Sequence, residues 1–101
     1  MHEYCRIKKE LARVLAEFGF QEVKPDFETD CYGSTYCIFA NREKRYMILW
    51  DGEERFGSVE AWENSCWIAL DTIVTESNEL EFRLALSTLC NELIDRLSKD
   101  I

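Results

Sequence analysis

Apolar residues near the start of the chain follow the spacing of one face of a helix. They recur at Tyr4, Ile7, Leu11, Val14, Leu15 and Phe18, and charged side chains fill most positions between them. Gly19 comes next, and glycine readily takes the left-handed backbone conformation that ends many helices. The pattern therefore predicts a helix over residues 4–18 that ends at Gly19, with Phe20 folding back as the hydrophobic contact of the cap.

The middle of the chain consists of short segments rich in β-branched and aromatic residues. Four of them are predicted as strands, namely residues 34–40, 45–51, 55–62 and 66–73. The three breaks between them are short and polar, as hairpin turns are. Residues 21–30 are polar and contain the only proline, Pro25, so we expect a short edge strand or an ordered loop there.

A second helical pattern closes the chain. Its apolar stripe is Phe82, Ala85, Leu86, Leu89, Cys90, Leu93, Ile94 and Leu97, and Thr75, Ser77 and Asn78 are alternative N-caps. Strands that are flanked by helices, without strand-helix-strand alternation, are typical of the α+β class. We predict one domain over residues 1–101: an antiparallel four-stranded meander, with or without a fifth short edge strand, and both helices on one face of the sheet.

Alternation along the predicted strands divides their side chains between two faces of the sheet. The set that we expect under the helices is Cys37, Phe39, Met47, Leu49, Gly57, Val59, Ala61, Ile68 and Leu70. The opposite set is Tyr36, Ile38, Tyr46, Ile48, Trp50, Phe56, Glu60, Trp62, Trp67 and Asp71. A second face this rich in tryptophan and tyrosine is unusual on a monomer and indicates an interface.

This aromatic face predicts a binding surface. Its candidate binding residues are Tyr36, Tyr46, Trp50, Trp62 and Trp67, together with the carboxylates Glu60 and Asp71. Two alternatives remain open from the sequence. Residues 21–33 could fold across the face, or a bulge could reverse the alternation in one strand.

The formal net charge of −8 limits the partners. Residues 1–50 hold eight basic and eight acidic side chains, while residues 51–101 hold four basic and twelve acidic ones. Such a surface repels phosphate backbones, which argues against direct binding of nucleic acid and favours a basic protein as partner. A second copy in a homodimer is the other partner we expect for the aromatic face, because symmetric dimers are the commonest oligomers. A mimic of DNA would need the acids of residues 51–81 in a regular row.

The first residues carry mixed charge without an apolar core, and no 18-residue apolar span occurs. We therefore expect a cytoplasmic protein without membrane contact.

The five cysteines form no Cys-x-x-Cys pair, and the only histidine, His2, is expected in a frayed end. We therefore predict neither a metal nor a cofactor. Only Cys31 and Cys37 could meet, across a tight hairpin. Asp26, Glu28 and Asp30 begin like a calcium loop, but cysteines take its glycine and final glutamate positions.

The sequence thus predicts a non-enzymatic, protein-binding or self-associating module, of the kind that inhibitors and immunity-type accessory proteins represent. No catalytic residue stands out, because a cysteine or serine nucleophile would lack a fixed base. The alternative is a small-molecule binder or enzyme. Its aromatic-lined pocket would hold Glu60 or Asp71 as an acid or base.

Overall fold

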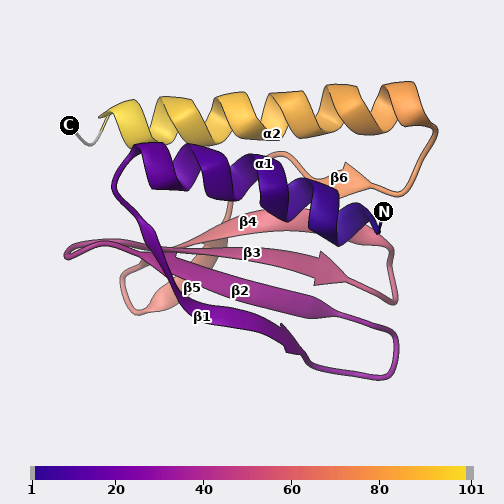
Figure 1. The fold of residues 1–101 in the computed structure, drawn as a ribbon, viewed down its shortest axis with the longest axis horizontal. Coiled ribbons are helices and arrows are strands. Elements are labelled where there is room, and N and C mark those ends of the chain that lie inside the picture. Colours follow the sequence, from indigo (N-terminus) through magenta and orange to yellow (C-terminus); the bar gives the residue numbers. More distant parts are fainter. Residues whose placement is uncertain (1, 100–101) are drawn as a thin grey trace.

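The computed structural model describes residues 2–99 and has the predicted α+β meander with a helix at each end (Figure 1). The elements are α1 (Glu3–Glu17), β1 (Gln21–Glu28), β2 (Thr35–Ala40), β3 (Arg45–Asp51), β4 (Phe56–Glu63), β5 (Cys66–Ala69), β6 (Val74–Thr75) and α2 (Glu79–Lys99). The strands pair antiparallel in the order β1-β2-β3-β4-β5, and the short β6 pairs with β4.

Both helices lie on one side of the sheet, as predicted (Figure 1). Residues 21–33 do not cross the other side, because β1 pairs with β2 and extends the sheet as its edge strand. At eight residues β1 is longer than a short edge strand, and its register shifts twice between Glu22 and Phe27. The opposite side of the sheet is therefore left uncovered by the described elements. No helix in residues 2–99 is long and apolar enough to span a membrane.

Helix α1 ends in the predicted way and begins in an unexpected one. Gly19 has a φ of +86°, and the N–H of Phe20 donates to the Leu15 carbonyl at 2.9 Å, which closes a Schellman motif over the buried Phe20 ring. At the other end His2 is not frayed. Its Nδ1 accepts a hydrogen bond from the Tyr4 N–H at 2.9 Å and so caps the helix.

Helix α2 begins at one of the three predicted caps. The Asn78 side-chain oxygen accepts the Glu81 N–H at 2.9 Å, and its backbone carbonyl accepts the Phe82 N–H at the same distance. Phe82, Leu86, Leu89, Leu93 and Leu97 then form the buried stripe that packs on the sheet and on α1.

The alternation predicted for β3 is wrong. Tyr46, Ile48 and Trp50 are buried beneath the helices, while Met47 and Leu49 point to the uncovered side. The register pairs Cys37 with Ile48 and Ile48 with Val59, and residues directly opposite each other share a face. Because residues 46–50 are apolar throughout, their hydrophobicity cannot choose between the two faces, and the hairpin registers decide.

Residues 70–73 interrupt the last predicted strand. The Asp71 and Thr72 N–H groups donate to the Glu92 carboxylate on α2 at 2.9 and 3.0 Å. The chain therefore turns toward α2 between β5 and β6. This position places Asp71 beside the C-terminal half of α2, whereas we had expected it on the aromatic face.

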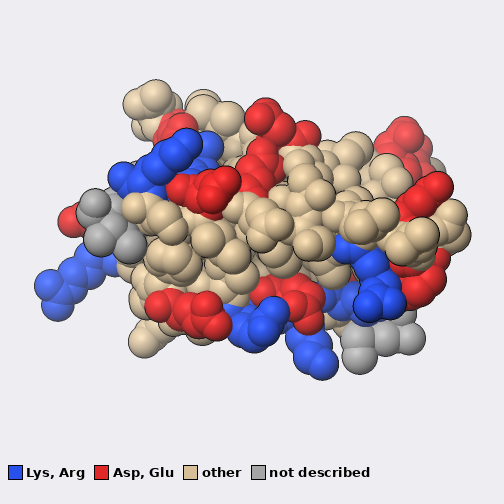
Figure 2. Space-filling view, turned by 90° about the horizontal axis from the view of Figure 1, so that it is seen from above, with Lys and Arg blue, Asp and Glu red and all other residues tan. Residues whose placement is uncertain are grey.

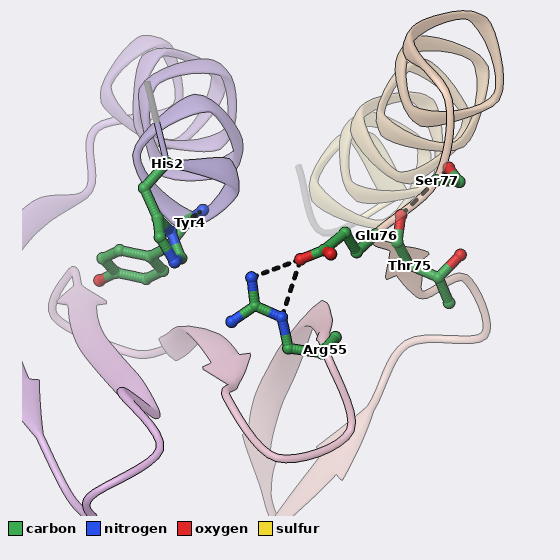
Figure 3. A network of polar contacts seen from close by, with 6 residues as sticks. All are labelled: His2, Tyr4, Arg55, Thr75, Glu76 and Ser77. Carbon is green, nitrogen blue, oxygen red and sulfur yellow. Dashed lines mark hydrogen bonds and ion pairs between the residues drawn. The ribbon is translucent and has the colours of Figure 1, made fainter.

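The N-terminal end of α1 covers Trp50. The His2 ring meets the indole edge-on, with centroids 5.4 Å apart, and the Arg55 guanidinium carbon lies 5.3 Å from the indole centroid. Arg55 also forms an ion pair with Glu76 in the segment before α2, and Figure 3 shows these two side chains reaching toward each other near His2 and Tyr4. The Trp50 ring is thus contacted by side chains from two separate parts of the chain, and one of them is held by Glu76.

Candidate functional site

The uncovered side of the sheet forms a continuous surface of mainly apolar side chains. We call it the open face; its members are Phe27, Tyr36, Ile38, Met47, Leu49, Phe56, Glu60, Trp62 and Trp67. The strand registers bring them together, since Phe27 lies opposite Tyr36, Ile38 opposite Met47, Met47 opposite Glu60, and Trp62 opposite Trp67.

Aromatic pairs occupy both ends of the open face. The Trp62 and Trp67 rings meet at 65° with centroids 5.2 Å apart, and the Phe27 and Tyr36 rings meet at 53° and 5.7 Å. Phe27 is 48% exposed and Trp62 is 41% exposed, so their rings present apolar area to solvent. Large rings with this exposure are the side chains most often found as anchors in protein interfaces.

A hollow of about 360 Å³ lies on this side of the sheet, beside Tyr36 and next to the turns that follow β1 and β3. Tyr36, Met47 and Leu49 form part of its lining. The charged residues around it are all acids: Asp30, Asp51, Glu53 and Glu60. Because neither lysine nor arginine is present in this lining, the acidic hollow is suited to a positively charged group that also carries apolar area.

Glu60 is the acid that belongs to the open face itself. It lies on β4 between Met47 and Ala69 of the neighbouring strands, and no side chain within residues 2–99 pairs with its carboxylate. Partial burial raises the pKa of Glu60 above its usual range. An unpaired carboxylate among apolar side chains costs stability, and a cation from outside would relieve that cost.

Glu60→Gln is expected to stabilise the protein at pH 7. A carboxyl whose pKa is higher in the folded state than in the unfolded state lowers stability when it is ionised, and this penalty disappears as the pH falls below both values. Since Glu60 is only partly buried and solvent screens its charge, the gain should be below about 1 kcal/mol. Urea unfolding at pH 7 and pH 3 measures it, and the two proteins should converge at pH 3. Equal stability at both pH values would contradict the assignment.

The structure separates the seven predicted binding residues into three groups. Tyr36, Glu60, Trp62 and Trp67 lie on the open face, Tyr46 and Trp50 are buried in the core, and Asp71 lies beside α2. Sequence reasoning missed Phe27, Met47 and Leu49. Met47 and Leu49 were assigned to the helix side because the alternation of β3 was predicted wrongly. Phe27 was missed because it lies in a polar segment that did not clearly predict a strand.

A second cluster of ionisable side chains joins α1 to β1 and β2. Glu22, Asp26 and Cys37 place ligand atoms within 4.8 Å of one another, but the Lys8 ammonium already lies 2.7 Å from both Glu22 and Asp26. The Tyr4 hydroxyl also donates to Asp26 at 2.7 Å, and burial raises the pKa of the Cys37 thiol. With its own cation and a neutral thiol, this cluster serves to attach the edge strand to α1.

Asp26 should make stability fall in acid. Burial works to raise its pKa, but hydrogen bonds from Lys8 and Tyr4 outweigh burial, and the net shift is downward. The stability from a lowered carboxyl pKa is present above the unfolded value, near 4, and is lost as the pH falls through the folded value. We expect Asp26→Asn to cost about 0.5–1 kcal/mol at pH 7 and nothing at pH 2, by urea unfolding. Asp95→Asn is the control, and an equal loss there would contradict the assignment.

The acids of residues 51–81 do not form a row. Glu63, Glu76 and Glu79 form ion pairs with Arg96, Arg55 and Arg6 respectively. Asp51 and Glu53 line the acidic hollow, whereas Asp71 lies beside α2. A regular line of carboxylates was the observation that a mimic of DNA required, and the structure gives it no support.

Together, the fold and the open face define a small α+β protein with an antiparallel sheet that is covered by two helices on one side only. No protein-family model, curated protein or solved structure matches the chain.

Proposed function

We propose that the protein is a binding module whose open face receives a basic segment of a partner protein. The observation that carries this proposal is the acidic hollow, in which four carboxylates and no cation surround apolar side chains. An arginine or lysine side chain could pair with Glu60 while its aliphatic part and its neighbours contact Tyr36 and Leu49. An inhibitor or immunity-type accessory protein that neutralises a cationic partner would use such a surface.

Charge favours a basic partner over a symmetric homodimer. In a two-fold pairing of open faces, the four carboxylates of the acidic hollow would share an interface with the same four from the second copy. Like charges in a desolvated interface are unfavourable, whereas a cationic partner would be attracted by the whole molecule, which carries a net charge of −8.

Selection from a library of random peptides tests the proposal with a defined probe. The immobilised protein should enrich peptides in which arginine or lysine stands next to apolar residues. Synthetic versions of the enriched peptides should bind Glu60→Arg at least about tenfold more weakly than the unchanged protein, because reversing one charge replaces attraction with repulsion. Trp62→Ala should also weaken binding, through loss of an exposed aromatic anchor.

Glu81→Arg is the matched control, since it makes the same charge change at an exposed position on α2. It should leave the affinity of the peptides within about threefold of the unchanged protein. Enrichment without basic residues, or equal binding by Glu60→Arg, would refute the proposal. If the protein forms a stable dimer that Trp62→Asp dissociates, the open face serves self-association and does not bind a basic partner.

A small organic cation is the alternative occupant, because the volume of the hollow suits a small ligand. Spermidine would then bind at Glu60 more tightly than any selected peptide.

We also propose a reducing, cytoplasmic location, which is consistent with unpaired cysteines and with the exposure of Cys5, Cys31 and Cys66.

A further inference from the structure

The side of the molecule opposite the open face carries a groove of the opposite charge. It runs between α1 and α2 and has a volume of about 730 Å³. Four basic side chains line it: Arg6, Lys9 and Arg13 from α1, and Arg83 from α2. Glu10 is the only acid in this lining, although the protein as a whole has 20 acids against 12 bases. We call this feature the helix groove.

Two of the four cations have no ion-pair partner. Arg6 binds Glu79 through two hydrogen bonds of 2.9 and 2.6 Å, and Arg13 pairs with Glu10. Within residues 2–99, neither Lys9 nor Arg83 has a carboxylate within ion-pair distance, and both are exposed. The groove therefore keeps positive charge beyond its own ion pairs, with Glu79 near Arg83 as well as bound to Arg6.

The remaining lining of the helix groove is largely apolar or uncharged. Val14 and Leu86 are buried, Cys90 is partly buried, and Ile94 is exposed. Figure 2 looks onto this side of the molecule and shows uncharged atoms over much of its middle, with most charged side chains toward the edges. The groove thus combines apolar area with a margin of positive charge.

The spacing of these side chains matches the dimensions of a helix. Arg6, Lys9 and Arg13 recur at intervals of three and four residues, so they form one row along α1. On α2 the lining extends from Arg83 to Ile94, a rise of roughly 16 Å or three turns. A row of cations beside an apolar strip of this length complements a helix with apolar residues on one face and acids along the flank.

We infer that the helix groove binds an acidic amphipathic helix of another protein. Apolar side chains of that helix would lie over Leu86 and Ile94, and its acids would pair with Lys9 and Arg83, as in other complexes where a helix occupies a groove. Charge complementarity carries this inference. A symmetric contact between two grooves would instead bring the cations of both copies together. The inference does not depend on what binds the open face.

A designed peptide tests the inference. The probe is a fluorescein-labelled helix-forming peptide of 15 residues, with leucines at positions i, i+3, i+4 and i+7 and glutamates beside them. Fluorescence anisotropy should show binding at least about tenfold tighter than that of a scrambled peptide or of a peptide with lysines in place of glutamates. Circular dichroism should show a gain of helix when the peptide and the protein are mixed.

Variants locate the peptide on the protein. The double variant Lys9→Glu, Arg83→Glu should weaken binding at least about tenfold, because attraction at the rim becomes repulsion. The control Arg42→Glu, Lys99→Glu makes the same charge change at exposed positions outside the groove lining and should alter binding less than about threefold.

Three outcomes would overturn the inference. They are equal binding of the scrambled peptide, equal weakening by the two double variants, and no binding of the glutamate peptide at millimolar concentration. Light scattering of the protein alone gives a further check. Self-association that Lys9→Glu, Arg83→Glu abolishes would mean that a second copy occupies the groove in place of an acidic helix.

Discussion

Trp50→Ala is expected to lower the free energy of unfolding by about 3–5 kcal/mol, whereas Trp62→Ala should lower it by less than about 1 kcal/mol. The same substitution has different consequences because Trp50 is 1% exposed under α1 and Trp62 is 41% exposed on the open face. Removal of the Trp50 indole leaves a cavity beside His2 and Arg55. Removal of the Trp62 indole mainly exposes its ring partner, Trp67.

Urea unfolding followed by far-ultraviolet circular dichroism measures both changes, since the signal does not depend on the tryptophan that is removed. Trp50→Phe is the conservative control. Phenylalanine keeps most of the side-chain volume, and no hydrogen bond is lost because the Trp50 indole N–H has no partner within residues 2–99. Trp50→Phe should therefore lower the free energy of unfolding by less than half as much as Trp50→Ala. Similar losses for Trp50→Ala and Trp62→Ala would contradict the observed orientation of β3.

The helices and their ends were predictable from local patterns. Gly19 and Phe20 predicted the glycine cap that ends α1 as a Schellman motif. Asn78 was among three candidates for the N-cap of α2. These features depend on residues within one or two helical turns, so the local sequence contains the information. The cap at His2 was missed because histidine is not a usual N-cap, and because the Trp50 ring that contacts His2 lies far away in the sequence.

The open face was predictable as a kind of surface but only partly in its membership. Glu60 and Trp62 were placed on the correct side of the sheet because the smaller, buried Val59 and Ala61 alternate with them along β4. In β3 both faces are apolar, and the choice between Trp50 and Leu49 was set by pairing with β2 and β4. Such pairing is a long-range property, because a shift of one residue reverses every side chain of a strand.

The acidic hollow could not be predicted, because its acids come from three different parts of the chain. Asp30 belongs to the turn after β1, Asp51 and Glu53 lie at the turn after β3, and Glu60 lies on β4. A contact between the two turns brings the first three acids near the fourth. Gly52 is at the centre of that contact, since its N–H donates to the Ser34 hydroxyl at 2.8 Å.

Gly52→Ala is therefore expected to affect both stability and the acidic hollow. A Cβ atom at Gly52 would overlap the Tyr32 carbonyl oxygen and would lie 2.7 Å from the Tyr32 carbonyl carbon and 2.8 Å from the Ser34 nitrogen. All three are backbone atoms, so relief requires the turn after β1 to move. We expect a loss of roughly 2–3 kcal/mol in the free energy of unfolding, as for other overpacked sites.

Gly19→Ala is the control that separates overlap from backbone conformation. Gly19 has a φ of +86° and open space around its Cα, so alanine there should cost roughly 1 kcal/mol from the left-handed conformation alone. Urea unfolding ranks the two variants, and equal losses would contradict the close approach of the two turns. Displacement of the turn would also shift Asp30 relative to Glu60 in the acidic hollow. Gly52→Ala should consequently weaken binding of the basic peptides that the open face selects. Gly19→Ala should leave their affinity unchanged, because the C-terminal cap of α1 lies outside the lining of the acidic hollow.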